Sequence, residues 1–229
     1  MNTFDQELKD HWIEVMQEHQ DADRLIQGDW LDQSSAKVVD NVEIFKGCFF
    51  GCAMQASSDA LFKATQAMNL PSWLVYFAEH IFEELPTNLA VNFPVELLKS
   101  IPVNSNIDKV LNLINIARLE TLKHKEHPEV NLVINKAIDY LKDSTKNSLK
   151  IVINEINEFE NEIQNKLFRA IIYSVNLSQN SKAAAATADW KSDNSDKHAA
   201  FCLNARYLAR EQSYIAEKNN LINALTNFS

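Results

Sequence analysis

The sequence predicts an all-α protein, and two observations about helix-breaking residues predict it. The 229 residues include only 3 glycines and 5 prolines, whereas an average chain of this length would hold roughly 16 glycines. Because sheet proteins use glycine in tight hairpins and bulges, a chain so poor in glycine argues against an all-β fold. In addition, neither glycine nor proline occurs after Pro128. We therefore expect long helices in the C-terminal half.

The same distribution divides the chain into two parts. All three glycines lie between Gly28 and Gly51, and the prolines end at Pro128. We expect a compact N-terminal helical unit over residues 1–105, which contains a loop rich in glycine and cysteine, followed by a bundle of long helices over residues 106–229. The alternative is one continuous domain.

The first helix is expected from about Asp5 to Ile26, because apolar residues recur there at helical spacing. Gly28 would end it, since glycine tolerates left-handed backbone geometry. Residues 29–46 are expected to form a loop that includes one short strand over residues 37–45, where β-branched residues gather.

Further helices follow from the same reasoning. Pro71 lies at an early helical position, where its missing N–H costs nothing. The three prolines Pro86, Pro94 and Pro102 divide the next stretch into short helices. Beyond them, helices are expected over residues 106–125, from Pro128 to about 141, after Asp143 to about 171, over 183–188 and over 196–225.

The helix expected after Asp143 has an apolar stripe that is close to a seam against a partner helix. The stripe runs from Leu149 to Ile171, and its candidate interface residues are Leu149, Ile153, Ile156 and Ile163. The stripe predicts either packing within the chain or pairing with a second subunit, and a homodimer through these residues is one hypothesis.

Composition excludes several classes of protein. The formal net charge of −9 disfavours nucleic-acid binding, which needs clustered Lys and Arg. No apolar run approaches the roughly 20 residues that cross a membrane, and the N-terminus lacks the layout of a secretion signal. We therefore expect a cytoplasmic protein. Its three cysteines are expected to be thiols in that compartment.

The densest group of candidate binding residues is Lys46-Gly47-Cys48-Phe49-Phe50-Gly51-Cys52. One interpretation is a metal site. Cys48 and Cys52 would share a face of a helix, and zinc takes about four ligands from Cys, His or carboxylate groups. His19 and His80 are the nearest further candidate ligands in the sequence. Zinc is the only cofactor that the sequence suggests.

Two other interpretations of this segment stay open. Gly47 and Gly51 could expose N–H groups to an anion or small ligand at a helix N-terminus, with Lys46, Gln27 and Gly28 nearby. Alternatively, the glycines let the backbone pack closely against a neighbouring helix, and the cysteines behave as small buried hydrophobic residues.

The segment Glu79-His80-Ile81-Phe82-Glu83-Glu84 also holds candidate residues. His80 and Glu84 are i and i+4, a spacing that suits a histidine oriented by a carboxylate. A metalloprotease helix would need a second histidine in the pattern His-Glu-x-x-His. The sequence therefore assigns no catalytic residue.

The order of several short motifs resembles a known family. The motifs are Gln27-Gly28, Gly47-Cys48-x-x-Gly51-Cys52, Leu70-Pro71-Ser72-Trp73-Leu74 and Ile81-Phe82-Glu83-Glu84-Leu85-Pro86. Together they resemble an uncharacterised family of mainly helical bacterial and phage-associated proteins. The resemblance covers roughly residues 20–105 and implies a shared fold around the Gly-Cys segment, but it implies no activity. Glu84 departs from the pattern, since the family has glycine there.

Two classes of function follow as hypotheses. The first is a non-enzymatic protein-interaction module of phage or mobile-element type that binds a protein partner, with inhibition of a host defence system as one form. The alternative is a small-ligand or metal-binding protein, including a hydrolase, centred on the Gly-Cys segment.

Overall fold

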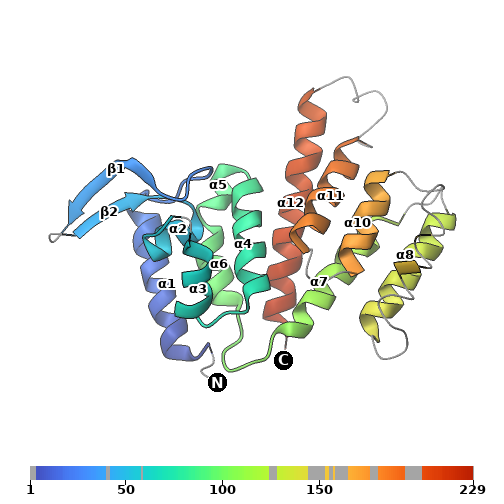
Figure 1. The fold of residues 1–229 in the computed structure, drawn as a ribbon, viewed down its shortest axis with the longest axis horizontal. Helices are drawn as coiled ribbons and strands as arrows, with labels where there is room; N and C mark the ends of the chain where they lie inside the picture. Colours follow the sequence, from blue (N-terminus) through green and yellow to red (C-terminus); the bar gives the residue numbers. More distant parts are fainter. Residues whose placement is uncertain are drawn as a thin grey trace. The chain divides into compact units, whose positions relative to one another are not determined.

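The computed structural model describes residues 4–39, 42–57, 59–123, 128–143, 153–154, 157, 165–175, 180–193 and 203–228. Within these residues the chain forms eleven helices and one two-stranded sheet (Figure 1). The predicted all-α fold class is therefore confirmed, apart from this small sheet. No helix in the described part of the chain combines the length and the apolar character needed to span a membrane.

The chain divides into two compact units. One comprises the residues up to Ile107 together with those from Leu225 onward, and the other comprises Asp108–Ala224. The first boundary falls between α6 (Phe93–Ser100) and α7 (Asp108–Thr121), the same connection in which the sequence places its boundary after residue 105.

The first unit contains eight elements in chain order. They are α1 (Gln6–Asp21), β1 (Asp32–Val39), β2 (Val42–Lys46), α2 (Phe49–Met54), α3 (Ala60–Ala67), α4 (Ser72–Glu84), α5 (Thr87–Ala90) and α6.

Helix α1 is shorter than the sequence predicts. It begins after Asp5, whose side chain accepts a hydrogen bond of 2.9 Å from the Leu8 N–H, as an N-cap residue does. It ends at Asp21 rather than near residue 26, because Asp23 adopts a left-handed backbone with φ of 52°. The chain then turns so that Leu25 forms a parallel bridge with Gly47.

The loop expected over residues 29–46 contains a β-hairpin. β1 and β2 pair antiparallel from Asp32 opposite Lys46 to Val39 opposite Val42, with an irregular register between Asp32 and Lys37. The prediction of a single strand over residues 37–45 is therefore wrong. The β-branched residues that indicated one strand are divided between two strands that pair with each other.

The core of the first unit is built around Phe49. Its ring stacks on Phe50, with centroids 4.0 Å apart, and lies at 6.4 Å from both Phe82 and Phe93. These four rings are buried, so α2, α4 and α6 meet at one aromatic cluster. This packing fixes the start of α2, and with it the Gly-Cys segment.

The second unit contains α7, α8 (Pro128–Lys142), α10 (Asn165–Val175), α11 (Asn180–Asp193) and α12 (Leu203–Thr226), whose last residues group with the first unit. Its apolar core includes Val133 and Ile134 of α8 and Leu167 and Ile171 of α10. These positions recur at helical spacing, as an amphipathic helix requires.

Candidate functional site

The Gly-Cys segment is tied to the loop that follows α1 by backbone hydrogen bonds. The Ile26 N–H donates to the Gly47 carbonyl at 2.9 Å, and the Gly47 N–H donates to the Arg24 carbonyl at 3.0 Å. The Cys48 N–H donates to the Asp29 carbonyl at 2.9 Å. The segment is thus held on one side by the loop and on the other by the aromatic core.

Two glycines allow the loop to lie against α2. A Cβ atom added to Gly47 would lie 2.2 Å from the Trp30 carbonyl oxygen, and one added to Gly51 would lie 1.9 Å from the same oxygen. Both distances are far below van der Waals contact. Close packing is therefore one role that these glycines have, although the neighbour is the Trp30 backbone rather than a helix. Gly28 differs, since it has φ of +95° and open space around it.

The N-terminus of α2 faces two carboxylates of α4. The Cys48 sulfur and one carboxylate oxygen each from Glu79 and Glu83 all lie within 4.8 Å of one another. Glu79 and Glu83 are i and i+4, so they occupy the same face of α4. We name Cys48, Glu79 and Glu83 the Cys-Glu-Glu cluster.

Each carboxylate of the cluster has a backbone donor. The Phe50 N–H donates to Glu79 Oε2 at 3.1 Å, and the Gly28 N–H donates to Glu83 Oε2 at 2.7 Å. The other oxygen of Glu79, Oε1, is buried and has no hydrogen-bond partner in the described part of the chain. Glu79 as a whole is only 6% exposed.

Burial dominates the acid–base behaviour of the cluster. It raises the pKa of Glu79 to about 7 and also raises the pKa of Glu83, which the Gly28 N–H bond partly offsets. Burial and the adjacent Glu79 carboxylate raise the pKa of the Cys48 thiol. In neutral solution Cys48 is therefore a thiol rather than a thiolate.

The second cysteine has different neighbours. Cys52 Sγ lies 3.4 Å from Nδ1 of His19, and its S–H group also lies near the Arg24 and Phe45 carbonyls. Burial raises the pKa of Cys52 to about 12, whereas burial and the charge of Arg24 lower the pKa of His19 to about 4. The pair is uncharged at neutral pH. It is thus not the thiolate–imidazolium pair of a cysteine nucleophile.

The low pKa of His19 predicts a loss of stability in acid. Its imidazole takes up a proton near pH 6.5 in the unfolded chain and near pH 4 in the folded one, so acid favours unfolding over this window. Between pH 7.5 and pH 4.5 we expect the wild type to lose about 2 to 3 kcal/mol more than a His19→Gln variant. Urea unfolding at both pH values measures this difference.

We compare the wild type with His19→Gln because Glu79 changes the stability with pH in the opposite direction. Its raised pKa makes the folded state bind the extra proton, so its contribution to stability declines as the pH rises from about 4.5 to about 7. The contribution of Glu79 is the same in the wild type and in the His19→Gln variant. Parallel losses of stability in the two proteins would contradict the assignment to His19.

The remaining predicted ligand residues have other partners. Gln27 Nε2 donates to the Phe82 and Leu85 carbonyls at 2.7 Å each, so it satisfies carbonyl groups at the end of α4. The Lys46 ammonium pairs with Asp23 at 3.0 Å. Cys52 and His80 do not belong to the Cys-Glu-Glu cluster, which is the group with metal-binding spacing among the described residues. The set Cys48, Cys52 and His80 is therefore not assembled.

The meeting of Glu79 and Glu83 with Cys48 was not predicted from the sequence, although their segment held candidate residues. The signal for a partner of these carboxylates was their position on α4. Glu79 lies four residues after Val75 and three before Phe82, both of which are fully buried. A charged residue at such a position in an apolar helix face must find a partner or carry a proton.

The predicted interface residues lie largely outside the described residues. This holds for Leu149, Ile156 and Ile163. Ile153 is described, and it is partly buried against the apolar core of the second unit. At Ile153 the contacts are therefore those of packing within the chain.

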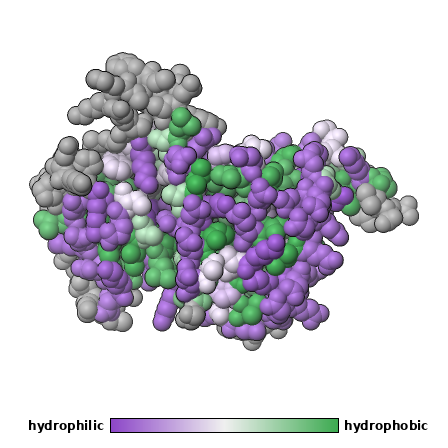
Figure 2. Space-filling view, turned by 180° about the vertical axis from the view of Figure 1, so that it is seen from behind, coloured by the Kyte–Doolittle hydropathy of each residue, from purple (hydrophilic) through white to green (hydrophobic). Residues whose placement is uncertain are grey.

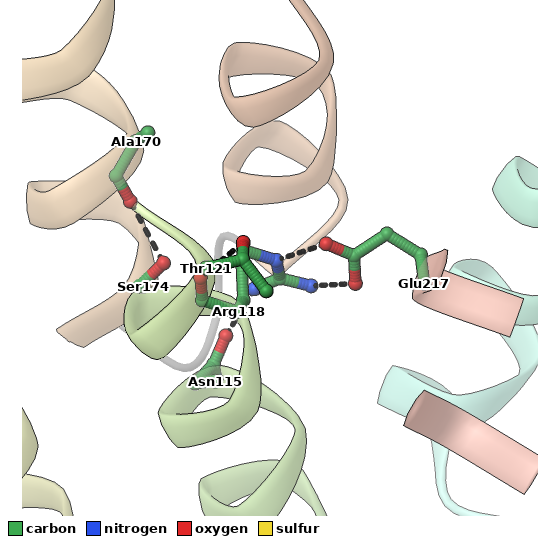
Figure 3. A network of polar contacts seen from close by, with 6 residues as sticks. All are labelled: Asn115, Arg118, Thr121, Ala170, Ser174 and Glu217. Atoms are coloured by element: carbon green, nitrogen blue, oxygen red, sulfur yellow. Dashed lines mark hydrogen bonds and ion pairs between the residues drawn. The ribbon is translucent and has the colours of Figure 1, made fainter. Parts of the chain in front are cut away.

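The second unit holds an ion pair in its interior (Figure 3). Arg118 of α7 donates to both carboxylate oxygens of Glu217 of α12, at 2.7 and 2.8 Å, and it also binds the Asn115 side chain. Arg118 is fully buried and Glu217 is 3% exposed. Burial lowers the pKa of the nearby Lys191. The negative charge of Glu217 raises this pKa, and the positive charge of Arg118 lowers it. The pair lies 99 residues apart in sequence, and no local pattern indicates it.

Several large apolar side chains of the first unit are exposed. They are Trp30, Val38, Phe62 and Tyr76, at 40%, 69%, 62% and 53% exposure. Figure 2 shows hydrophobic residues scattered among hydrophilic ones on one face, and some of them lie on the hairpin at the right-hand edge.

Comparison of the chain with protein-family models, with curated proteins and with solved structures finds no match.

Proposed function

We propose that the chain is a non-enzymatic protein-interaction module of phage or mobile-element type, and that it binds its partner through the β1–β2 hairpin. The observation that carries this proposal is that the sheet has two strands in the part of the chain that the structure describes. Among the described residues β1 pairs with β2 alone. The outer edge of β1 therefore offers backbone N–H and C=O groups that a further strand can use.

The side chains of the hairpin support a docking role. Ala36, Lys37 and Val38 are exposed, and Val38 is the most exposed of the large apolar residues described. In Figure 1 the strands extend past the helices of their own unit. An isolated two-stranded hairpin is marginally stable in water. A third strand would stabilise the hairpin and bury Val38 against a cross-strand neighbour.

The partner that fits this edge is an extended segment of another protein, because its main chain can supply the complementary hydrogen bonds. The resemblance to phage-associated proteins favours a host protein as the source of this segment, including a component of a defence system. We place the interaction in the cytosol, where Cys48 and Cys52 stay reduced.

The chemistry of the buried cysteines also supports a binding role. Both thiols have raised pKa values, and the imidazole beside Cys52 has a lowered one. A thiol must ionise to act as a nucleophile. Cys48, and Cys52 beside His19, are therefore poor nucleophiles at neutral pH, which favours binding over a nucleophilic reaction.

The test is capture of partners from the native host by the tagged full chain, with Val38→Lys as the variant. A charge at this position opposes addition of a strand, so we expect a stoichiometric partner of the wild type to be depleted at least 10-fold. Phe62→Lys is the matched control, because it makes the same kind of change at a similarly exposed apolar residue of α3. Mass spectrometry quantifies both.

Three outcomes would contradict the proposal. The partner could persist with Val38→Lys and disappear with Phe62→Lys, or no protein could be recovered in stoichiometric amount. Light scattering could also reveal a homodimer that Val38→Lys dissociates, in which case a second copy of the chain occupies the edge.

A further inference from the structure

We propose that Cys48, Glu79 and Glu83 form a binding site for a divalent transition-metal ion of the zinc type. The proposal concerns the interior of the first unit and does not depend on the hairpin. It also differs from the ligand set that the sequence suggested, since it contains neither Cys52 nor His80.

The spacing of the three ligand atoms suits a metal ion. In a tetrahedral zinc site, bonds of about 2.3 Å to sulfur and about 2.1 Å to oxygen place one sulfur and two oxygen atoms roughly 3.4 to 3.6 Å apart. The atoms of the Cys-Glu-Glu cluster lie within 4.8 Å of one another. They would need to approach one another by roughly 1 Å to bind one ion together.

An independent observation comes from Glu79. This residue is 6% exposed, and its Oε2 atom already accepts the Phe50 N–H. Its Oε1 atom is buried without a hydrogen-bond partner in the described part of the chain. A buried polar atom is normally satisfied, and one that is not calls for an ion, a water or a proton. The carboxylate lies beside Cys48 and Glu83, so a cation bound there would satisfy it.

The charges around the cluster also favour a bound cation. Three potential anions converge on it, namely one thiol and two carboxyl groups. Lys46 lies two residues before Cys48, but its ammonium group is paired with Asp23. A divalent cation would neutralise the converging groups where Lys46 does not.

The surroundings hold the three ligands in place. Gly28 donates to Glu83, and Gln27 binds the carbonyl groups at the end of α4. Gly47 and Gly51 let the Trp30 backbone approach the start of α2, where Cys48 lies. Such outer contacts orient metal ligands in known sites.

The donor set selects the type of metal. Thiolate sulfur disfavours Mg²⁺ and Ca²⁺, which take oxygen ligands, whereas zinc accepts sulfur, nitrogen and oxygen. Three protein ligands leave one position of a tetrahedron for water or an exogenous group. The site is thus expected to bind Zn²⁺ and the related ion Co²⁺.

The experiment is titration of the chelator-treated full chain with Zn²⁺ in competition with a chromogenic chelator. We expect one ion per chain, and at least 100-fold weaker binding in both Cys48→Ser and Glu79→Gln. Glu79→Gln keeps the shape of the side chain and removes the buried charge, so it should fold. Glu84→Gln, the neighbouring change on α4, is the matched control and should bind as the wild type does.

Two further measurements identify the ligands. Co²⁺ should give a sulfur-to-metal charge-transfer band in the near ultraviolet, present in the wild type and absent in Cys48→Ser, with circular dichroism confirming that the variant is folded. The Cys52→Ser variant should retain this band. The proposal is overturned if the wild type binds no Zn²⁺ in the competition, if Glu79→Gln binds as tightly as the wild type, or if Cys52→Ser rather than Cys48→Ser loses the band.

Discussion

We expect replacement of Glu217 by alanine to destabilise the second unit by about 3 to 5 kcal/mol, because it leaves a buried charge without its partner. Arg118 is fully buried and makes two hydrogen bonds to the Glu217 carboxylate. Without Glu217 its guanidinium group must stay charged in an apolar interior. Lys191 would lose the same nearby anion. Urea unfolding followed by circular dichroism measures the loss.

Two further variants separate the ion pair from packing. The double variant Arg118→Met with Glu217→Leu removes both charges while it keeps side-chain volume, so we expect it to recover most of the stability. Lys63→Ala breaks the exposed pair with Asp59 and should cost under about 1 kcal/mol. The account is contradicted if Glu217→Ala costs no more than Lys63→Ala.

The second large effect is expected from Gly51→Ala. The added Cβ atom would lie 1.9 Å from the carbonyl oxygen and 2.8 Å from the carbonyl carbon of Trp30. Both are backbone atoms, so no side-chain rotation relieves the overlap. Either the loop or α2 must move, which breaks the bond from Cys48 N–H to the Asp29 carbonyl. We expect a loss of about 3 kcal/mol or more, measured by urea unfolding.

Gly28→Ala is the matched control for Gly51→Ala. Gly28 has φ of +95°, but no atom lies within 4 Å of the position that its Cβ would take. The cost is therefore backbone strain alone, about 1 to 2 kcal/mol. Equal destabilisation by the two substitutions would show that the contact with Trp30 does not limit Gly51.

The helical architecture could be predicted from the sequence because helix formation depends on local properties. Scarce glycine, apolar spacing and the absence of proline after Pro128 act within a few residues of each position. The end of α1 was predicted wrongly, because the left-handed turn at Asp23 replaces the expected stop at Gly28. The hairpin was also missed, because the β-branched residues of both strands follow one another closely in the sequence and indicated a single strand.

In the candidate site, too, the sequence reveals local motifs but not the contacts between distant residues. Cys48, Gly47 and Gly51 form a dense local motif, and Glu79 and Glu83 belong to a second segment with candidate residues. Their meeting depends on how α2 packs on α4 around Phe49, and no spacing within one helix reveals it. The sequence therefore paired Cys48 with the nearest cysteine, four residues away, rather than with carboxylates about thirty residues later.

By itself, the sequence determined which stretches coil into helices and that a glycine-bearing N-terminal half is followed by uninterrupted helices. Only the tertiary structure decided which polar groups meet in the interior, as Arg118 with Glu217 and Cys48 with Glu79 and Glu83. The physical reason is range: backbone propensity acts between neighbours, whereas a buried polar group is stabilised by whichever partner the packing of distant helices brings to it.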